Sequence, residues 1–264
     1  MLRDRELERL AGDLADAWQK ASVIIELPDE RRPQNRAEAY AVQDTMARLL
    51  GEPVSGWKLG ATSQRMRELD GHDDVIPGRM FASTTFTGTD LELPAERFPD
   101  ARVETEFAFR LTRDIELREK SWTAAEVAPR LLFHPALEII GNRYPTGPRA
   151  PHVGSLETIA DNGGGIGFVF GDGVADIRGV DFRNHVIALR VDDRTAAENF
   201  LGDMRCLPFE AVADLANHLR ERGEALKSGD FVSTGAATVP QHVTQGSRVH
   251  ADFGVLGSIR VHFT

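Results

Sequence analysis

The segment 101–111 places two glutamates two residues apart in a run of strand-forming residues, and this spacing constrains how the whole chain can fold. Side chains at i and i+2 of a strand point to the same face, with roots roughly 7 Å apart. Glu104 and Glu106 would therefore direct both carboxylates at one point, where a cation would offset their charge. The alternative interpretation is a solvated polar face opposite a buried one. The spacing by itself leaves both interpretations open.

The composition restricts what the chain can bind. With 264 residues and 41% hydrophobic content, it can bury a full core as one large domain or as a domain with a helical appendage. The 41 acidic and 31 basic residues give a net charge of -10, which argues against a general nucleic-acid or anionic membrane partner. An anionic ligand would need a local cation. The single cysteine, Cys206, excludes internal disulfides and a thiolate cluster, and is predicted to be a small packing residue.

The N-terminus is charged and lacks an apolar signal region. The apolar runs are also far shorter than the roughly 20 residues that a membrane span requires. From both features we expect a cytoplasmic protein without a membrane partner.

Hydrophobic periodicity predicts helices first and strands afterwards. Leucines and a tryptophan recur at spacings of three and four over residues 4–20, and a second helix is expected between an N-cap at Asn35 and Gly51. A capping pattern at Thr123 predicts a further helix through Leu132, and another is expected over residues 208–222. Strands are expected over residues 81–86, 90–93, 103–111, 137–140, 168–170 and 184–191, and within 226–235 and 247–263.

Many short strands with glycine turns favour a β-rich α+β fold over a doubly wound sheet. We expect an N-terminal helical segment at residues 1–52, packed on a β-rich catalytic core at residues 53–264. Three loops are expected: 72–78 with a Pro77–Gly78 turn, 144–158 as a lid or binding loop, and 161–167. The glycines of this last loop are not followed by Gly-Lys-Ser/Thr, so they predict close approach of the backbone rather than a phosphate loop.

Two charged residues are difficult to explain on structural grounds alone. Lys58 stands between Trp57 and Leu59, so its amine either extends to solvent or sits in a partly desolvated pocket that lowers its pKa. Glu138 lies within an apolar strand, where an unpaired buried carboxylate is costly. It faces water at a sheet edge, or it has an arginine, a set of hydrogen bonds or a metal ion as its partner.

Three segments, Gly56–Ser63, Arg102–Phe109 and Pro135–Arg143, resemble the family of 2-keto-4-pentenoate hydratases and 4-oxalocrotonate decarboxylases, a branch of the fumarylacetoacetate hydrolase superfamily. The resemblance runs almost end to end and includes Ala160–Asn162 and the closing Gly254–Val261. It implies a fumarylacetoacetate-hydrolase-like core behind the N-terminal helices. It also implies a homo-oligomer, with a complex with another pathway enzyme as a further option.

The resemblance implies an Mg²⁺ or Mn²⁺ ion held by Glu104, Glu106 and Glu138, with Lys58 as the catalytic acid/base. The substrate-binding residues that it implies are Arg143, Ser233, Thr234 and Gly235. The implied substrate is a small anionic 2-oxo or 2-hydroxy-dienoic acid, whose carboxylate and C2 oxygen would chelate the ion. The implied reaction is hydration of 2-hydroxypenta-2,4-dienoate to a 4-hydroxy-2-oxo acid, or decarboxylation of 4-oxalocrotonate, in the breakdown of aromatic compounds.

Two departures from the family pattern leave the reaction open. Hydratases of the family carry an Asp just before the segment that matches Gly78–Phe81, where this chain has Ile76–Pro77; Asp73 and Asp74 lie slightly earlier. The glycines 163–165 also stand where relatives commonly have a hydroxyl group.

Two alternatives therefore remain. One is an acylpyruvate C–C hydrolase, for which His152 with Glu157, or His72, would activate water. The other is a non-catalytic subunit that supports a partner enzyme.

Overall fold

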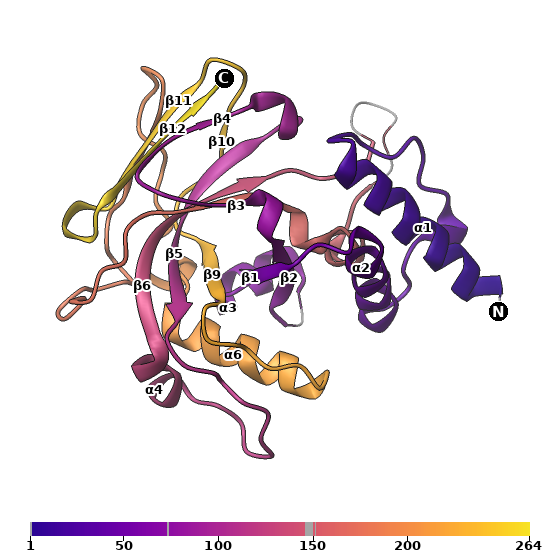
Figure 1. Ribbon diagram of the computed structural model, residues 1–264, viewed down its shortest axis with the longest axis horizontal. Coiled ribbons are helices and arrows are strands. Elements are labelled where there is room, and N and C mark those ends of the chain that lie inside the picture. Colours follow the sequence, from indigo (N-terminus) through magenta and orange to yellow (C-terminus); the bar gives the residue numbers. More distant parts are fainter. Residues whose placement is uncertain (1, 73, 146–149, 151) are drawn as a thin grey trace.

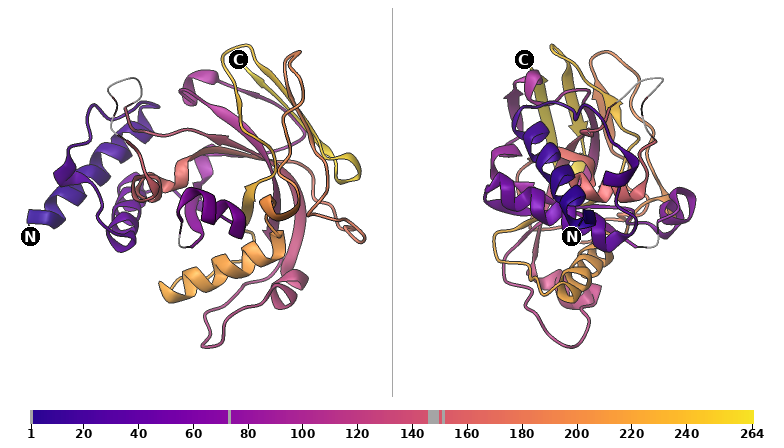
Figure 2. Two further views of the ribbon diagram at one scale, coloured as in Figure 1. Left: turned by 180° about the vertical axis from the view of Figure 1, so that it is seen from behind. Right: turned by 90° about the vertical axis from the view of Figure 1, so that its right-hand side faces the viewer.

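The computed structural model describes residues 2–72, 74–145, 150 and 152–264. A curled β-sheet core fills one end of the molecule, and the two N-terminal helices project from the other end (Figure 1). The expected β-rich α+β fold is confirmed. The two views of Figure 2 show that the N-terminus lies at the helical end and the C-terminus on the sheets. In the described part of the chain, no helix combines the length and apolarity needed to cross a membrane.

Among the described residues, the larger sheet has eight strands in the order β2-β1-β9-β5-β6-β7-β3, and β10 pairs with β5. Neighbours run antiparallel except for the parallel pairs β1 with β9 and β3 with β7. The strands are β1 (Val54–Gly60), β2 (Ile76–Phe81), β3 (Thr85–Thr87), β5 (Arg102–Leu111), β6 (Leu131–Ile140), β7 (Gly165–Phe170), β9 (Phe231–Ala236) and β10 (Gln241–His242).

The smaller sheet has the order β4-β12-β11-β8. Its strands are β4 (Asp90–Leu93), β8 (Ala188–Val191), β11 (Arg248–Asp252) and β12 (Ser258–Phe263). The largest apolar cluster joins both sheets to α6 (Pro208–Glu221) and includes Phe107, Leu189, Leu215 and Val261. One face of β5 therefore points into this core, as its alternating pattern predicts.

The N-terminal helices are α1 (Leu2–Gln19) and α2 (Arg36–Leu50). The predicted caps of α2 are confirmed, because the Asn35 side chain accepts a hydrogen bond from the Glu38 backbone and Gly51 has a left-handed conformation. A second apolar cluster joins both helices to Phe81 of β2 and to α5 (Ser155–Ala160). The remaining helices are α3 (Gln64–Asp70) and α4 (Ala124–Val127).

Two expectations about where elements begin and end are wrong: a turn at Pro77–Gly78, and the end of the helix that is capped at Thr123. The predicted turn at Pro77–Gly78 lies inside β2, which is an edge strand and so tolerates the missing N–H of proline. The helix capped at Thr123 ends at Val127, and Leu132 belongs to β6, because pairing with the long strand β5 extends β6 toward its start.

Three further expectations are corrected. A 3₁₀ turn at Ala82–Thr84 interrupts the strand expected over residues 81–86. The strand expected from residue 184 begins at Ala188, because the Asn199 side chain binds both backbone groups of Ile187. The loop expected over 144–158 contains the start of α5. Residues 146–149 and 151 of this loop lie outside the described residues, and its function as a lid or binding loop stays a prediction.

Candidate active site

Three glutamates meet on the face of the larger sheet that points away from the main core. Glu104 of β5 is directly opposite Glu138 of β6 in the strand register, and Glu106 follows two residues later on the same face. One carboxylate oxygen from each lies within 4.8 Å of the others. The residues are 8%, 1% and 0% exposed for Glu104, Glu106 and Glu138, so the alternative of a solvated polar face is wrong.

The charged forms of these carboxylates are unfavourable in the protein without a bound cation. Burial and the neighbouring Glu138 raise the pKa of Glu104 to about 8, and burial with both neighbours raises the pKa of Glu106 well above its ordinary value. Among the described residues, Glu106 Oε1 and Glu138 Oε2 have no hydrogen-bond partner, and Glu138 Oε1 has only an ion pair with Lys58. Buried acceptors are normally paired. Three hard oxygen donors in this arrangement fit Mg²⁺ or Mn²⁺ better than zinc.

Lys58 of β1 lies beside the glutamates and does not extend to solvent. Its Nζ atom is 3.1 Å from Glu138 Oε1 and donates a hydrogen bond of 2.8 Å to the Gly163 carbonyl. Burial lowers the pKa of Lys58, but the negative charges of the glutamates, Glu138 first, outweigh burial and raise it. The amine therefore lies in a desolvated pocket, and the carboxylates raise its pKa where desolvation alone would lower it.

The turn at the end of β9 holds one of the glutamates in place. The Ser233 hydroxyl and the Gly235 backbone N–H both donate to Glu106 Oε2, the latter over 2.8 Å. The Thr234 hydroxyl instead donates to the Phe107 carbonyl. Gly235 has a φ of +110°, and a Cβ there would lie 2.2 Å from Thr62 Oγ1. Ser233 and Gly235 thus gather at the site, and Thr234 packs behind it.

Arg143 makes polar contacts with Asp161. Its Nη1 atom is 2.6 Å from Asp161 Oδ1, and its backbone N–H donates to the other oxygen of that carboxylate. The guanidinium also lies 3.9 Å from the centre of the Trp18 ring. Together with Trp18 it lines a cavity of about 280 Å³. A contact between Arg143 and the substrate stays a prediction.

The glycine-rich turn after α5 brings backbone against the charged side chains, which confirms the predicted close approach. A Cβ on Gly165 would lie 2.7 Å from Glu138 Oε1 and 3.0 Å from Lys58 Cε. Sequence reasoning missed the neighbouring contribution of Asn162 and Gly163, whose carbonyl binds Lys58. The signal was present, because an Asn-Gly-Gly run is typical of left-handed backbone, and the φ angles here are +55°, +72° and +76°.

Asp74, which precedes the segment where the family has an Asp, contacts α6. Its carboxylate accepts from the Val75 backbone N–H and faces His218 of α6 at 3.3 Å. Asp73, the other residue considered, lies outside the described residues.

Two of the three residues expected to activate water in a hydrolase, Glu157 and His72, make contacts at α5. The Glu157 carboxylate is 2.8 Å from Arg32 and accepts from the Gly154 backbone N–H. His72 Nδ1 is 2.7 Å from the Ser155 hydroxyl. These contacts cap the helix, so the hydrolase alternative is not favoured.

No family model matches the chain. It is 28% identical to the 2-keto-4-pentenoate hydratase of Burkholderia vietnamiensis over 269 residues, which covers 100% of both chains. It is 30% identical to the 2-oxo-hept-4-ene-1,7-dioate hydratase of Escherichia coli, covering 86% of each. The solved structure of 4-oxalocrotonate decarboxylase from Pseudomonas putida G7, complexed with magnesium and adipate, superposes with a TM-score of 0.85 at 22% identity over 100% of this chain and 99% of that one.

These relatives match the chain over most or all of its length, and the superposition shows the same fold. The similarity is therefore not confined to three short segments: it covers the whole sequence and the whole fold. The chain belongs to the family of 2-keto-4-pentenoate hydratases and 4-oxalocrotonate decarboxylases.

Proposed function

We propose that the protein is an Mg²⁺- or Mn²⁺-dependent lyase that acts on a small 2-oxo or 2-hydroxy-dienoic acid in the catabolism of aromatic compounds. Its leading reaction is hydration of 2-hydroxypenta-2,4-dienoate to a 4-hydroxy-2-oxo acid, and the related one is decarboxylation of 4-oxalocrotonate. The observation that carries the proposal is the meeting of Glu104, Glu106 and Glu138, with unpaired buried oxygens, beside Lys58. Relatives named as hydratases support the choice of reaction.

The ion would be held by the carboxylates of Glu104, Glu106 and Glu138. When bound, it supplies the positive charge that an acidic protein needs to bind a 2-oxo acid, and it polarises the C2 carbonyl. Ser233 and Gly235 keep the Glu106 carboxylate oriented through two donated hydrogen bonds. This gives these two residues of β9 a role in supporting a metal ligand.

Lys58 is the residue that moves a proton. Its Nζ atom is fixed by Glu138 on one side and by the Gly163 carbonyl on the other, so the amine has a defined position. The side chain is only 6% exposed, which limits proton exchange with bulk water. In this proposal the amine gives a proton to a carbon of the dienol while the C2 hydroxyl loses its proton, which converts the dienol to the keto form.

The test is incubation of the purified protein and Mg²⁺ with 2-hydroxypenta-2,4-dienoate. The dienol absorbance should disappear faster than by spontaneous ketonisation, and a 4-hydroxy-2-oxo acid should form. Release of CO₂ from 4-oxalocrotonate would assign the decarboxylase reaction, and turnover of an acylpyruvate panel would assign the hydrolase. A protein inactive on every substrate would support the non-catalytic subunit. Lys58→Met is the matched inactive variant.

Assembly and location are proposals that rest on the resemblance and the composition. We infer a homo-oligomer, a cytoplasmic location and, as a further option, a complex with another enzyme of the pathway. We also propose a division into a helical segment of residues 1–52 and a catalytic core of residues 53–264. Light scattering of the purified protein tests the first of these.

A further inference from the structure

The turn that binds Lys58 is held in an unusual backbone conformation. Asn162, Gly163 and Gly164 all have left-handed φ angles, and Asn162 is 1% exposed. The Gly163 carbonyl at the centre of this turn is the hydrogen-bond partner of Lys58 Nζ. Any movement of the turn would therefore move the position that the amine can occupy.

One side chain fastens this turn to the edge of the larger sheet. Asn162 Oδ1 accepts from the Arg79 backbone N–H over 2.7 Å, and Asn162 Nδ2 donates to the Arg79 carbonyl over 2.6 Å. The amide thus pairs with β2 as a neighbouring strand would. Gly78 lets the two segments approach, because a Cβ there would lie 2.2 Å from the Asn162 carbonyl oxygen.

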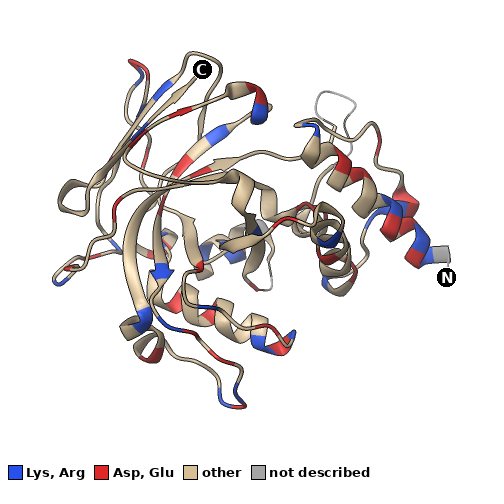
Figure 3. Ribbon diagram, in the orientation of Figure 1, with Lys and Arg blue, Asp and Glu red and all other residues tan. Residues whose placement is uncertain are grey.

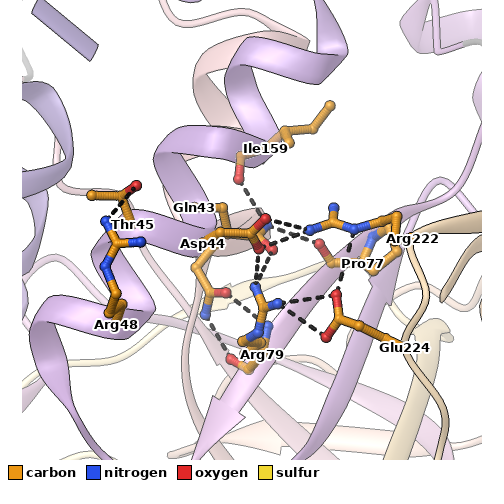
Figure 4. Close-up of polar contacts among 10 residues, drawn as sticks. Gln43, Asp44, Thr45, Arg48, Pro77, Arg79, Ile159, Arg222 and Glu224 are labelled. Atoms are coloured by element: carbon orange, nitrogen blue, oxygen red, sulfur yellow. Dashed lines mark hydrogen bonds and ion pairs between the residues drawn. The ribbon is translucent and has the colours of Figure 1, made fainter. Parts of the chain in front are cut away.

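A second amide reinforces the same junction. Gln43 of α2 donates from Nε2 to the Ile159 carbonyl, at 2.9 Å, and to the Pro77 carbonyl, at 3.0 Å. Its Oε1 atom accepts from the Arg79 guanidinium. Figure 4 shows Gln43 between Ile159 of α5 and Pro77 and Arg79 of β2. The segments on either side of the Asn162 contact are therefore tied together at a further point.

We propose that Asn162 is a positioning residue for Lys58: its two hydrogen bonds to Arg79 fix the turn whose Gly163 carbonyl holds the amine beside Glu138. The inference deepens the proposed function, on which its kinetic consequence rests. The Asn162 side chain binds the Arg79 backbone rather than a glutamate, so its effect on Lys58 passes through Gly163. The ion's ligands are therefore expected to stay in place when Asn162 is replaced.

The chain contains a matched control for the loss of these hydrogen bonds. Asn217 of α6 also binds both backbone groups of one residue, accepting from the Trp122 N–H over 2.8 Å and donating to its carbonyl over 2.9 Å. Neither residue contributes to the glutamate and lysine cluster. Asn217→Ala therefore removes an equivalent pair of hydrogen bonds away from Lys58.

The test variant is Asn162→Gly, which keeps the left-handed backbone accessible while it removes both hydrogen bonds. We expect kcat to fall by about tenfold or more, with KM and the Mg²⁺ dissociation constant within about threefold of wild type. Asn217→Ala should keep the wild-type kcat. The proposal is overturned if kcat falls no further in the Asn162 variant than in the Asn217 variant, or if Mg²⁺ affinity falls in parallel with kcat.

A spectroscopic measurement separates this inference from the proposed function. The chain has four lysines, and Lys20, Lys120 and Lys227 have side chains that are 68%, 79% and 64% exposed. With ¹³Cε-lysine labelling, the buried Lys58 should give a signal apart from the other three. That signal should shift or broaden in Asn162→Gly and stay unchanged in Asn217→Ala. An unchanged Lys58 signal in both overturns the proposal, even if wild-type protein turns over no substrate tested.

Should Asn162→Gly not yield folded protein, Asn162→Asp replaces it in both measurements. Aspartate also tolerates the left-handed conformation and can accept from the Arg79 N–H, but it cannot donate to the Arg79 carbonyl. The same fall in kcat and the same change in the Lys58 signal are expected. Wild-type values for both would overturn the proposal.

Discussion

Glu104, Glu106 and Glu138 bring three carboxylates into the protein interior, and Lys58 supplies one positive charge beside them. Burial, together with repulsion among carboxylates that a single lysine cannot neutralise, raises the pKa of Glu104 and that of Glu106. A divalent cation would balance the remaining charge and would coordinate the oxygens that lack hydrogen bonds. At the scale of single residues, the site is therefore costly without a cation.

The stability of the metal-free protein should fall as the pH rises. The folded state binds the Glu104 proton more tightly than the unfolded state, since its pKa is about 8 instead of 4.5. The resulting stabilisation is full below pH 4.5 and is lost as the pH rises through about 8. Thermal unfolding in EDTA across this range should show the decline, and Mg²⁺ should raise Tm most at its upper end. A metal-induced Tm shift that does not vary with pH would contradict this expectation.

Replacing one carboxylate of the site should weaken ion binding, whereas replacing an exposed carboxylate elsewhere should not. In Glu106→Gln, loss of an anionic ligand should weaken Mn²⁺ binding by more than about 100-fold. Ser233→Ala should weaken Mn²⁺ binding by roughly 10-fold to 100-fold, because it removes a hydrogen bond that orients the Glu106 carboxylate. Calorimetric titration measures both. Glu92→Gln, whose side chain is 78% exposed, is the control and should bind Mn²⁺ as wild type does. Unchanged affinity in the Glu106 variant would remove the basis of the proposed ion site.

At the scale of elements, two pairs of strands and one turn build the site. Antiparallel pairing of β5 with β6 sets Glu104 opposite Glu138, and the parallel pairing of β1 with β9 aligns Lys58 with Ser233. The turn between α5 and β7 then covers the charged side chains. Its glycines leave room for the Glu138 and Lys58 side chains. A residue that carries a hydroxyl group also carries a Cβ, which would enter this space, so the glycines are compatible with the site.

Adding a methyl group at Gly165 should weaken ion binding, because the methyl group would displace a ligand without changing any charge. A Cβ at Gly165 would lie 2.6 Å from the Phe168 ring and 2.7 Å from Glu138 Oε1, so Gly165→Ala must displace the carboxylate. We expect Mn²⁺ affinity to fall by about tenfold or more. Gly12→Ala, in α1 with nothing within 4 Å of the added Cβ, should instead raise the unfolding free energy by about 0.5–1 kcal/mol. Wild-type affinity in Gly165→Ala would show that Glu138 is not constrained by the turn.

At the scale of the whole molecule, charged residues of both signs are interspersed along α1 and α6 (Figure 3). One group of charges joins distant parts of the chain. Asp44 of α2 binds Arg79 of β2 at 2.7 Å and Arg222, just after α6, at 2.7 Å, and Glu224 faces both arginines (Figure 4). The N-terminal helices are therefore held to the core by ion pairs as well as by the second apolar cluster.

Removing the shared anion should loosen this connection. Asp44→Ala leaves two arginines without one of their partners, and we expect a loss of about 1 kcal/mol in unfolding free energy, discounted because the Asp44 side chain is 45% exposed. Asp16→Ala removes a pair with Lys20 in which both side chains are about two-thirds exposed, and should cost less than about 0.5 kcal/mol. Chemical denaturation measures both. Equal losses in the two variants would contradict a stabilising role for the network.

Local sequence determined much of the chain's secondary structure. It also determined that Glu104 and Glu106 share a face and that Glu138 requires a partner. The period of two in segment 102–111 placed Glu104 and Glu106 on one face, and Asn35 and Gly51 set the ends of α2. The isolated Glu138 signalled the need for a partner, because its cost depends on the polarity of its immediate neighbours. These properties follow from dihedral preferences and side-chain chemistry within a few residues.

Only the tertiary structure decided which distant groups meet. Lys58 and its partner Gly163 are 105 residues apart in the chain, and the sheet register, rather than any local propensity, sets Glu104 against Glu138. The pairing of Arg143 with Asp161 and with the Trp18 ring likewise joins residues that lie far apart in the sequence. Local preferences cannot specify such contacts, because their energies arise only when folding brings the segments together and excludes water from between them.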